Sequence, residues 1–109
     1  MIYVSGRLRA DNLDHYRSQF QSAKDYLIHD VWVYEDSSIY TLVQLYDDVL
    51  ANKDLSDYLM QDELEDRVNM VKKCDCVYFL IGWEYDDMCR VEHTFAKAYR
   101  KRIVYSKKF

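Results

Sequence analysis

The chain has 109 residues, half of them apolar and 16% aromatic, with a formal charge of -4. This length fits a single domain with one core, and the aromatic content excludes an intrinsically disordered chain. The negative charge excludes general affinity for duplex nucleic acid or for an anionic membrane surface. No stretch approaches the roughly 18 apolar residues of a membrane span. Three cysteines, an odd number, favour the reducing environment of the cytoplasm.

Four short apolar runs predict β-strands, at residues 1–5, 31–34, 76–81 and 103–105. The first run stops at Gly6 and the third at Gly82. The third run is the most continuous, which is typical of a central strand covered by helices on both faces.

Between these runs, apolar residues recur at helical spacing. The expected helices are residues 13–27, which Asp11 would cap, two helices within 39–73 that separate near 52–54, and residues 91–99. In the last helix the expected apolar face holds Val91, Phe95, Ala98 and Tyr99. Strands that alternate with helices predict an α/β fold over residues 1–109, with a parallel sheet of about four strands between two helical layers.

A ligand of such a sheet binds beyond the carboxyl ends of the strands, where the strand order reverses. The predicted ends are residues 5–7 and 82–84, with Arg67 and Arg90 as further phosphate ligands, since arginine is planar and permanently charged. Trp83 offers a flat face for a base. The full set of expected ligand-binding residues is Tyr3, Ser5, Gly6, Arg7, Arg67, Gly82, Trp83, Asp86 and Arg90.

Other kinds of site lack a pattern. Two isolated glycines cannot build a glycine-rich phosphate loop, so none of the usual nucleotide cofactors is expected. The three histidines are scattered, and Cys74 and Cys76 are separated by one residue instead of the two of a zinc site. We therefore expect neither a cofactor nor a metal.

Residues 2–6, residues 74–84, and Glu92 followed by Ala96 and Ala98 resemble the nucleoside 2-deoxyribosyltransferase-like superfamily. Within it, the chain is most similar to a small family common in bacteriophages and bacteria. The resemblance implies a small Rossmann-like domain, often dimeric, that cleaves or exchanges the glycosidic bond of deoxynucleosides or their monophosphates. It also implies that Glu92 attacks the anomeric carbon, with help from an aspartate eight residues before Asp75 and from a Ser-x-Gly segment.

The chain departs from this pattern at both supporting places. Arg67 stands where the aspartate is expected, and Asp86 and Met88 stand where serine and glycine are expected. An arginine there adds an anion-binding group and removes a proton carrier. Asp86 would repel a phosphate to which serine would donate.

Two hypotheses follow. The favoured one is a non-catalytic nucleotide-binding protein, for instance a phage protein that sequesters a host nucleotide signal, with Trp83 or Tyr3 stacking the base. The alternative is an active deoxyribosyltransferase or nucleosidase in which Glu92 is the nucleophile. Ser5 and Tyr3 would then position the sugar, and Asp66 or Asp87 would supply the missing acid.

A protein partner is a third possibility. Eleven tyrosines favour a surface that binds a protein. The helices within 39–73 carry more apolar positions than a small sheet covers, so we expect a homodimer.

Overall fold

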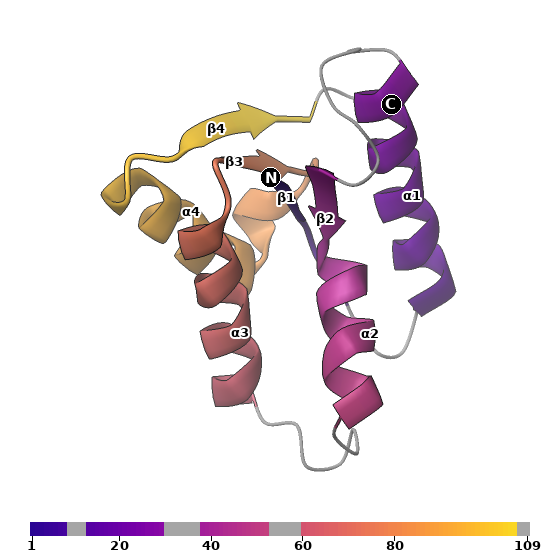
Figure 1. Ribbon diagram of the computed structural model, residues 1–109, viewed down its shortest axis with the longest axis horizontal. Coiled ribbons are helices and arrows are strands. Elements are labelled where there is room, and N and C mark those ends of the chain that lie inside the picture. The colour runs from indigo at the N-terminus through magenta and orange to yellow at the C-terminus, as the bar shows by residue number, and fades with distance from the viewer. Residues whose placement is uncertain (9–12, 30–37, 53–59, 107–109) are drawn as a thin grey trace.

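The computed structural model describes residues 1–8, 13–29, 38–52 and 60–106. In chain order its elements are β1 (Ile2–Ser5), α1 (Leu13–His29), β2 (Ile39–Thr41), α2 (Leu42–Asn52), α3 (Met60–Lys73), β3 (Cys76–Phe79), the short 3-10 helix η4 (Trp83–Tyr85), α4 (Asp87–Ala98) and β4 (Arg102–Tyr105) (Figure 1).

The four strands form one parallel sheet in the order β2-β1-β3-β4. The chain moves outward from β1 to β2 and outward in the other direction from β3 to β4, so right-handed crossovers place α1 and α4 on opposite faces. Figure 1 shows α1 on one side of the sheet and α3 with α4 on the other. The predicted α/β fold with a four-stranded parallel sheet is confirmed, and it is that of a small Rossmann-like domain.

The strand order reverses between β1 and β3, where Ser5 lies opposite Phe79. Beyond this point Leu80 donates its backbone N–H to the Ser5 carbonyl at 2.9 Å. The carboxyl ends of both central strands are therefore fixed side by side. In Figure 1, α2 continues from the end of β2 past this edge of the sheet.

Apart from β2, each predicted element corresponds to an observed one, although β3 ends at Phe79 instead of residue 81 and α4 begins at Asp87 instead of residue 91. The strand expected at residues 31–34 lies outside the described residues, and Ile39–Thr41, which we expected to begin a helix, forms β2 instead. Thr41 and Gln44 form a capping box, in which Thr41 Oγ1 accepts from the Gln44 N–H at 3.2 Å and Gln44 Oε1 accepts from the Thr41 N–H at 2.9 Å. This box starts α2 directly after the strand, so strand and helix read as one periodic run.

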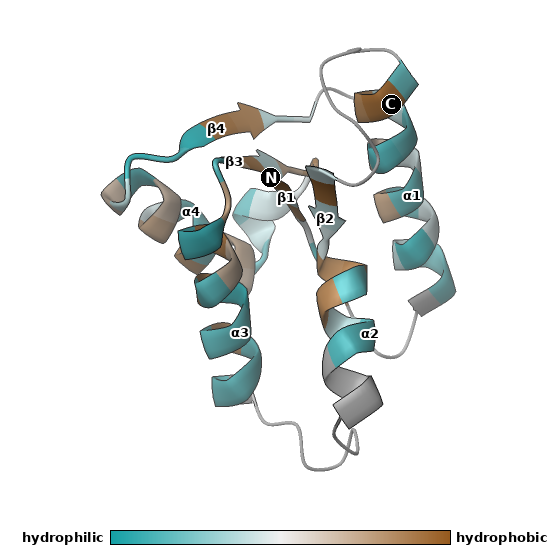
Figure 2. Cartoon of the chain, viewed as in Figure 1, coloured by the Kyte–Doolittle hydropathy of each residue, from teal (hydrophilic) through white to brown (hydrophobic). Residues whose placement is uncertain are grey.

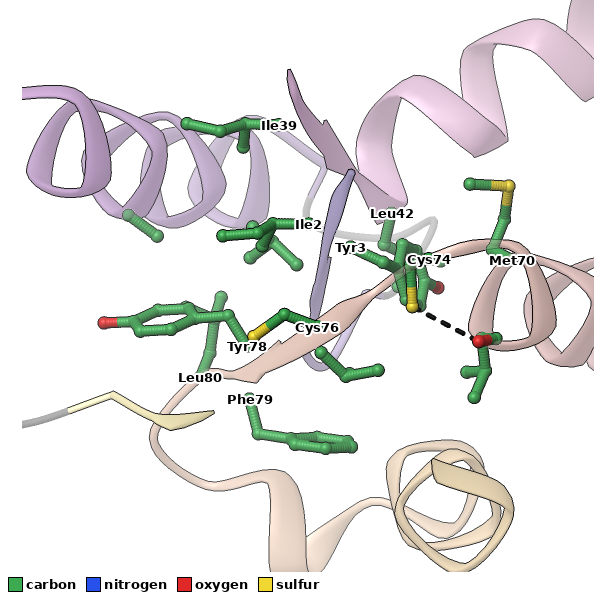
Figure 3. Close-up of a cluster of buried hydrophobic side chains, with 14 of the residues drawn as sticks. Ile2, Tyr3, Ile39, Leu42, Met70, Cys74, Cys76, Tyr78, Phe79 and Leu80 are labelled. Carbon is green, nitrogen blue, oxygen red and sulfur yellow. Dashed lines mark hydrogen bonds between the residues drawn. The ribbon is translucent and has the colours of Figure 1, made fainter. Parts of the chain in front are cut away.

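Side chains alternate between the two faces of each central strand. In Figure 3, Ile2 and Tyr78 point toward α1, whereas Tyr3 points toward α3. Figure 2 shows apolar residues concentrated in the strands, while α3 is mostly hydrophilic. Ser5 is two residues from Tyr3, so it lies on the side of α3 and α4.

None of the helices in the described ranges combines the length and the apolar character of a membrane span.

The two glycines have different reasons to be glycine. Gly82 has φ 90°, a left-handed conformation, and a Cβ there would meet nothing within 4 Å. Gly6 has no such φ; a Cβ there would lie 2.8 Å from Leu80 Cδ1 and 3.1 Å from Phe20 Cζ. Gly6, one of the expected ligand-binding residues, is therefore required for close packing against Leu80 and Phe20.

We expect Gly82→Ala to lower the free energy of unfolding by about 1 kcal/mol and Gly82→Asn by less, because asparagine tolerates the left-handed region. Gly6→Ala is expected to cost about 1–3 kcal/mol through overpacking, and Gly6→Asn more. Urea unfolding of the four variants measures these values. If the asparagine variant were more stable than the alanine variant at both positions, the packing role of Gly6 would be contradicted.

Candidate functional site

A buried polar cluster lies beneath the carboxyl ends of the central strands. β1 contributes Tyr3 and Ser5, α3 contributes Arg67, and α4 contributes Cys89 and Glu92. All five side chains are inaccessible to solvent, with Arg67 1% exposed and the other four 0%. An arginine and a glutamate buried this deeply must be paired, since an isolated buried charge is very costly.

The pairing converges on one carboxylate oxygen. Glu92 Oε1 accepts from Arg67 Nε at 2.7 Å, from Arg67 Nη2 in a still shorter contact, and from Ser5 Oγ at 2.9 Å. The remaining guanidinium contacts are long: Nη1 lies 3.4 Å from Glu63 Oε1, and Nη2 lies 3.5 Å from both the Gly6 carbonyl and Cys89 Sγ. Arg67 therefore ties α3 to α4 and to the end of β1.

Two atoms of the cluster are buried and lack a hydrogen-bond partner in the described part of the chain, the Tyr3 hydroxyl and Glu92 Oε2. Burial raises the pKa of Tyr3 well above its ordinary value, and the nearby Glu92 charge raises it further. Burial opposes the charge on Arg67, yet the adjacent Glu92 carboxylate outweighs that effect and raises the arginine pKa. Arg67 thus stays charged.

The geometry of this cluster is more consistent with a role in stabilising the fold than with cleavage of a glycosidic bond. A nucleophilic carboxylate must reach the anomeric carbon of a sugar, but Glu92 is 0% exposed and one of its oxygens is saturated by Arg67 and Ser5. Arg67 cannot act as a general acid near neutral pH because its pKa lies far above that range. The Arg67 guanidinium is also paired with Glu92, so it is not available to hold the phosphate that we expected it to bind.

The position of Glu92 on α4 explains why its burial was not anticipated. The buried residues of α4 are Cys89, Glu92 and Ala96, spaced so that they share one face of the helix. The face that we expected to be buried was wrong: Val91 and Phe95 are half-buried, and Ala98 and Tyr99 are exposed. The small side chains of Cys89 and Ala96, one turn before and one turn after Glu92, let the helix approach the sheet. Cys89 was therefore the sequence feature that could have indicated the burial of this face.

Trp83 lies in a different environment, an aromatic cluster. Its ring stacks on His93 with a centroid distance of 4.2 Å and an angle of 23°, and it also lies near Phe79 and Tyr105. His93 Nε2 is 2.6 Å from the Tyr105 hydroxyl. The indole thus packs on the protein's own rings. His93 could be expected near Trp83 because both follow the end of the same predicted strand, whereas no sequence pattern predicted Tyr105 as a neighbour.

The other predicted ligand residues on this side belong to the start of α4. Asp86 is the N-cap, and its carboxylate accepts from the Cys89 N–H at 3.0 Å. Arg90 is exposed and pairs with Asp87 one turn away. Gly82 precedes η4 and accepts from the Tyr85 N–H at 3.0 Å. Asp86 thus contacts the buried cluster through the Cys89 backbone, and the described contacts of Arg90 do not include the cluster.

Arg7 follows Gly6 directly at the carboxyl end of β1 and is half-buried. Its Nε is buried without a hydrogen-bond partner in the described ranges. Of the three arginines expected to hold phosphate, Arg67 pairs with Glu92 and Arg90 with Asp87. Arg7 is the one for which the described residues provide no carboxylate.

Among the described residues, no group of three or more His, Cys, Asp or Glu side chains is placed so that it could hold a metal ion. Cys74, Cys76 and Cys89 are free and buried.

The Cys89 thiol is expected to make the protein less stable as the pH rises into the alkaline range. Burial raises the pKa of this thiol to about 12, so the folded state holds the proton more tightly than the unfolded state. Its contribution to stability is complete below the unfolded pKa and is lost as the pH rises toward the folded pKa. We expect Cys89→Ala to lose less free energy of unfolding than the wild type between about pH 8 and pH 11. Equal losses, measured by urea unfolding, would contradict this role.

The comparisons with known proteins give one match. The model of a protein family described as a domain of unknown function (DUF4406) matches residues 1–105. No curated protein and no solved structure matches the chain.

Proposed function

The chain belongs to the DUF4406 family, and we propose that it binds a nucleotide at the carboxyl ends of β1 and β3 without cleaving the glycosidic bond. One observation carries the second half of this proposal. Glu92, the residue that would attack the sugar, is fully buried and paired with Arg67. A carboxylate held in this way stabilises the packing of α4 on the sheet and does not meet a substrate.

The binding half of the proposal rests on the fold and on Arg7. Parallel sheets of this kind bind ligands where the strand order reverses, which here lies between β1 and β3. Arg7 stands at that point with a buried Nε that lacks a partner among the described residues. A phosphate oxygen would supply the missing acceptor and a compensating charge.

The resemblance to the nucleoside 2-deoxyribosyltransferase-like superfamily suggests the ligand class and also the rival function. Glu92 Oε2 and the Tyr3 hydroxyl have no hydrogen-bond partner among the described residues, so a sugar that reached them could pair with both, but both side chains are fully buried. For turnover, however, Arg67 would have to leave Glu92 and expose a buried charge. We therefore favour binding of an intact nucleotide, as in a phage protein that sequesters a host nucleotide signal.

The test offers deoxynucleosides, deoxynucleotides, NAD-derived nucleotides and cyclic nucleotides to the purified protein, and reads thermal shift and free base on the same samples. We expect a thermal shift with a phosphorylated ligand and no free base. Free base that disappears with Glu92→Gln would establish the rival enzyme instead. No shift with any nucleotide would contradict the binding proposal.

A matched pair of arginine variants locates the site. We expect Arg7→Gln to raise the Kd of the nucleotide at least roughly tenfold, because a charged hydrogen bond to phosphate is lost. Arg102→Gln removes the same charge from the exposed amino end of β4 and is expected to leave the Kd unchanged. Equal effects of the two substitutions would mean that only the overall charge matters.

We further propose that the protein is a homodimer, because α2 leaves apolar side chains such as Val43 and Leu45 only partly buried. Light scattering on a size-exclusion column is expected to give twice the chain mass of 13.2 kDa at micromolar concentration. A mass of one chain would contradict the dimer and leave the nucleotide proposal intact.

A further inference from the structure

A groove runs between α3 and α4 on their outer side, near the amino ends of both helices. Its volume is about 610 Å³, and its apolar wall is formed by Leu64, Tyr85, Met88 and Val91. Met88 and Val91 are three residues apart on α4, so they share one face of that helix. Tyr85 is 83% exposed, the highest value among the large apolar side chains described.

The segments that form the groove carry an excess of negative charge. Residues 60–67 and 83–92 contain eight carboxylates and two guanidinium groups, a formal charge of -6, whereas the whole chain carries -4. Asp86 and Asp87 line the groove itself, together with Gln61. An apolar floor within an acidic rim selects a partner that is apolar on one side and basic on the other.

We propose that this groove binds a basic amphipathic helix of a partner protein. Such a helix inserts a row of apolar side chains between α3 and α4 and places its lysines or arginines against the carboxylates of the rim. A second copy of the chain fits less well, because a two-fold contact would bring the two acidic rims together. Nucleic acid is repelled by the same charge. This surface is separate from the buried cluster and does not depend on the nucleotide proposal.

The probe is a fluorescein-labelled amphipathic helix built only of leucine and lysine, with binding followed by fluorescence anisotropy. We expect the double variant Met88→Gln, Val91→Gln to weaken binding at least roughly tenfold, since the apolar anchors lose their pocket. Ile81→Gln is the matched control: Ile81 is 57% exposed but does not line the groove, so its loss is expected to leave binding unchanged. A peptide in which glutamate replaces lysine is expected to bind at least roughly tenfold more weakly.

Two further points keep the outcome decisive. If the double variant melts at a lower temperature than the wild type, Tyr85→Ser replaces it, because a side chain this exposed contributes little to the fold. If the groove variants bind the leucine–lysine helix as tightly as the wild type does, the proposal is overturned, and the binding is explained by the overall charge of the protein alone. Equal binding of the leucine–glutamate helix would overturn the basic partner.

Discussion

Arg67→Met is expected to lower the free energy of unfolding by about 3–5 kcal/mol, because it leaves the Glu92 carboxylate buried without its counter-charge. Glu92 is 0% exposed and cannot recover hydration without moving α4 off the sheet. The Ser5 hydroxyl, at 2.9 Å, is then its one remaining donor among the described residues. Urea unfolding at neutral pH, read by circular dichroism, measures the change.

The control is the double variant Arg67→Met, Glu92→Met, which replaces both charges by apolar side chains. A buried ion pair is often matched in stability by packed apolar residues, so we expect most of the loss to be recovered. The Ser5 hydroxyl loses its acceptor in this variant, so a deficit of about 1–2 kcal/mol is expected to remain. Losses that simply add in the double variant would contradict a direct pair between Arg67 and Glu92.

Phe79→Ala is expected to cost about 3–5 kcal/mol through the cavity left at the end of β3. Phe79 is fully buried, and its ring lies 5.3 Å from Trp83, 5.2 Å from His93 and 6.3 Å from Tyr105, measured between centroids. The substitution removes the ring against which Trp83 of η4 and His93 of α4 pack. Urea unfolding measures the cost, and near-ultraviolet circular dichroism reports the packing of the remaining rings.

Phe79→Leu is the matched control, because it keeps most of the apolar volume and removes only the ring. We expect it to cost less than half of what alanine costs and to leave η4 in place. Half-buried Phe95 and exposed Tyr99, at the carboxyl end of α4, have ring centroids 5.8 Å apart and offer a second comparison, since Tyr99→Ala is expected to cost less than about 1 kcal/mol. A small cost for Phe79→Ala would contradict its place at the centre of the cluster.

Much of the fold could be predicted from hydrophobic period alone. Residues 76–81 read as a central strand because every position is apolar, and β3 is buried on both faces. The strand at Ile39–Thr41 could not be predicted, because three residues followed at once by a capped helix have no period of their own. Where strand and helix meet without a loop, pattern cannot separate them.

The sequence analysis singled out four members of the buried cluster, Tyr3, Ser5, Arg67 and Glu92, but not Cys89 and not their arrangement. Arg67 and Glu92 were both expected to face a ligand, and they instead face each other. Sequence spacing says which side of a helix a residue occupies, but it does not say which residue of another helix lies opposite. Cys89, one turn before Glu92, was the available signal that this side of α4 is buried.

The most direct test of the account compares the wild type with the variant Arg67→Met, Glu92→Met on the same nucleotide, with binding followed by calorimetry and free base by chromatography. If Glu92 serves the fold, both proteins bind with the same Kd and return the nucleotide intact. Free base released by the wild type and not by the variant would contradict the account and make Glu92 a nucleophile.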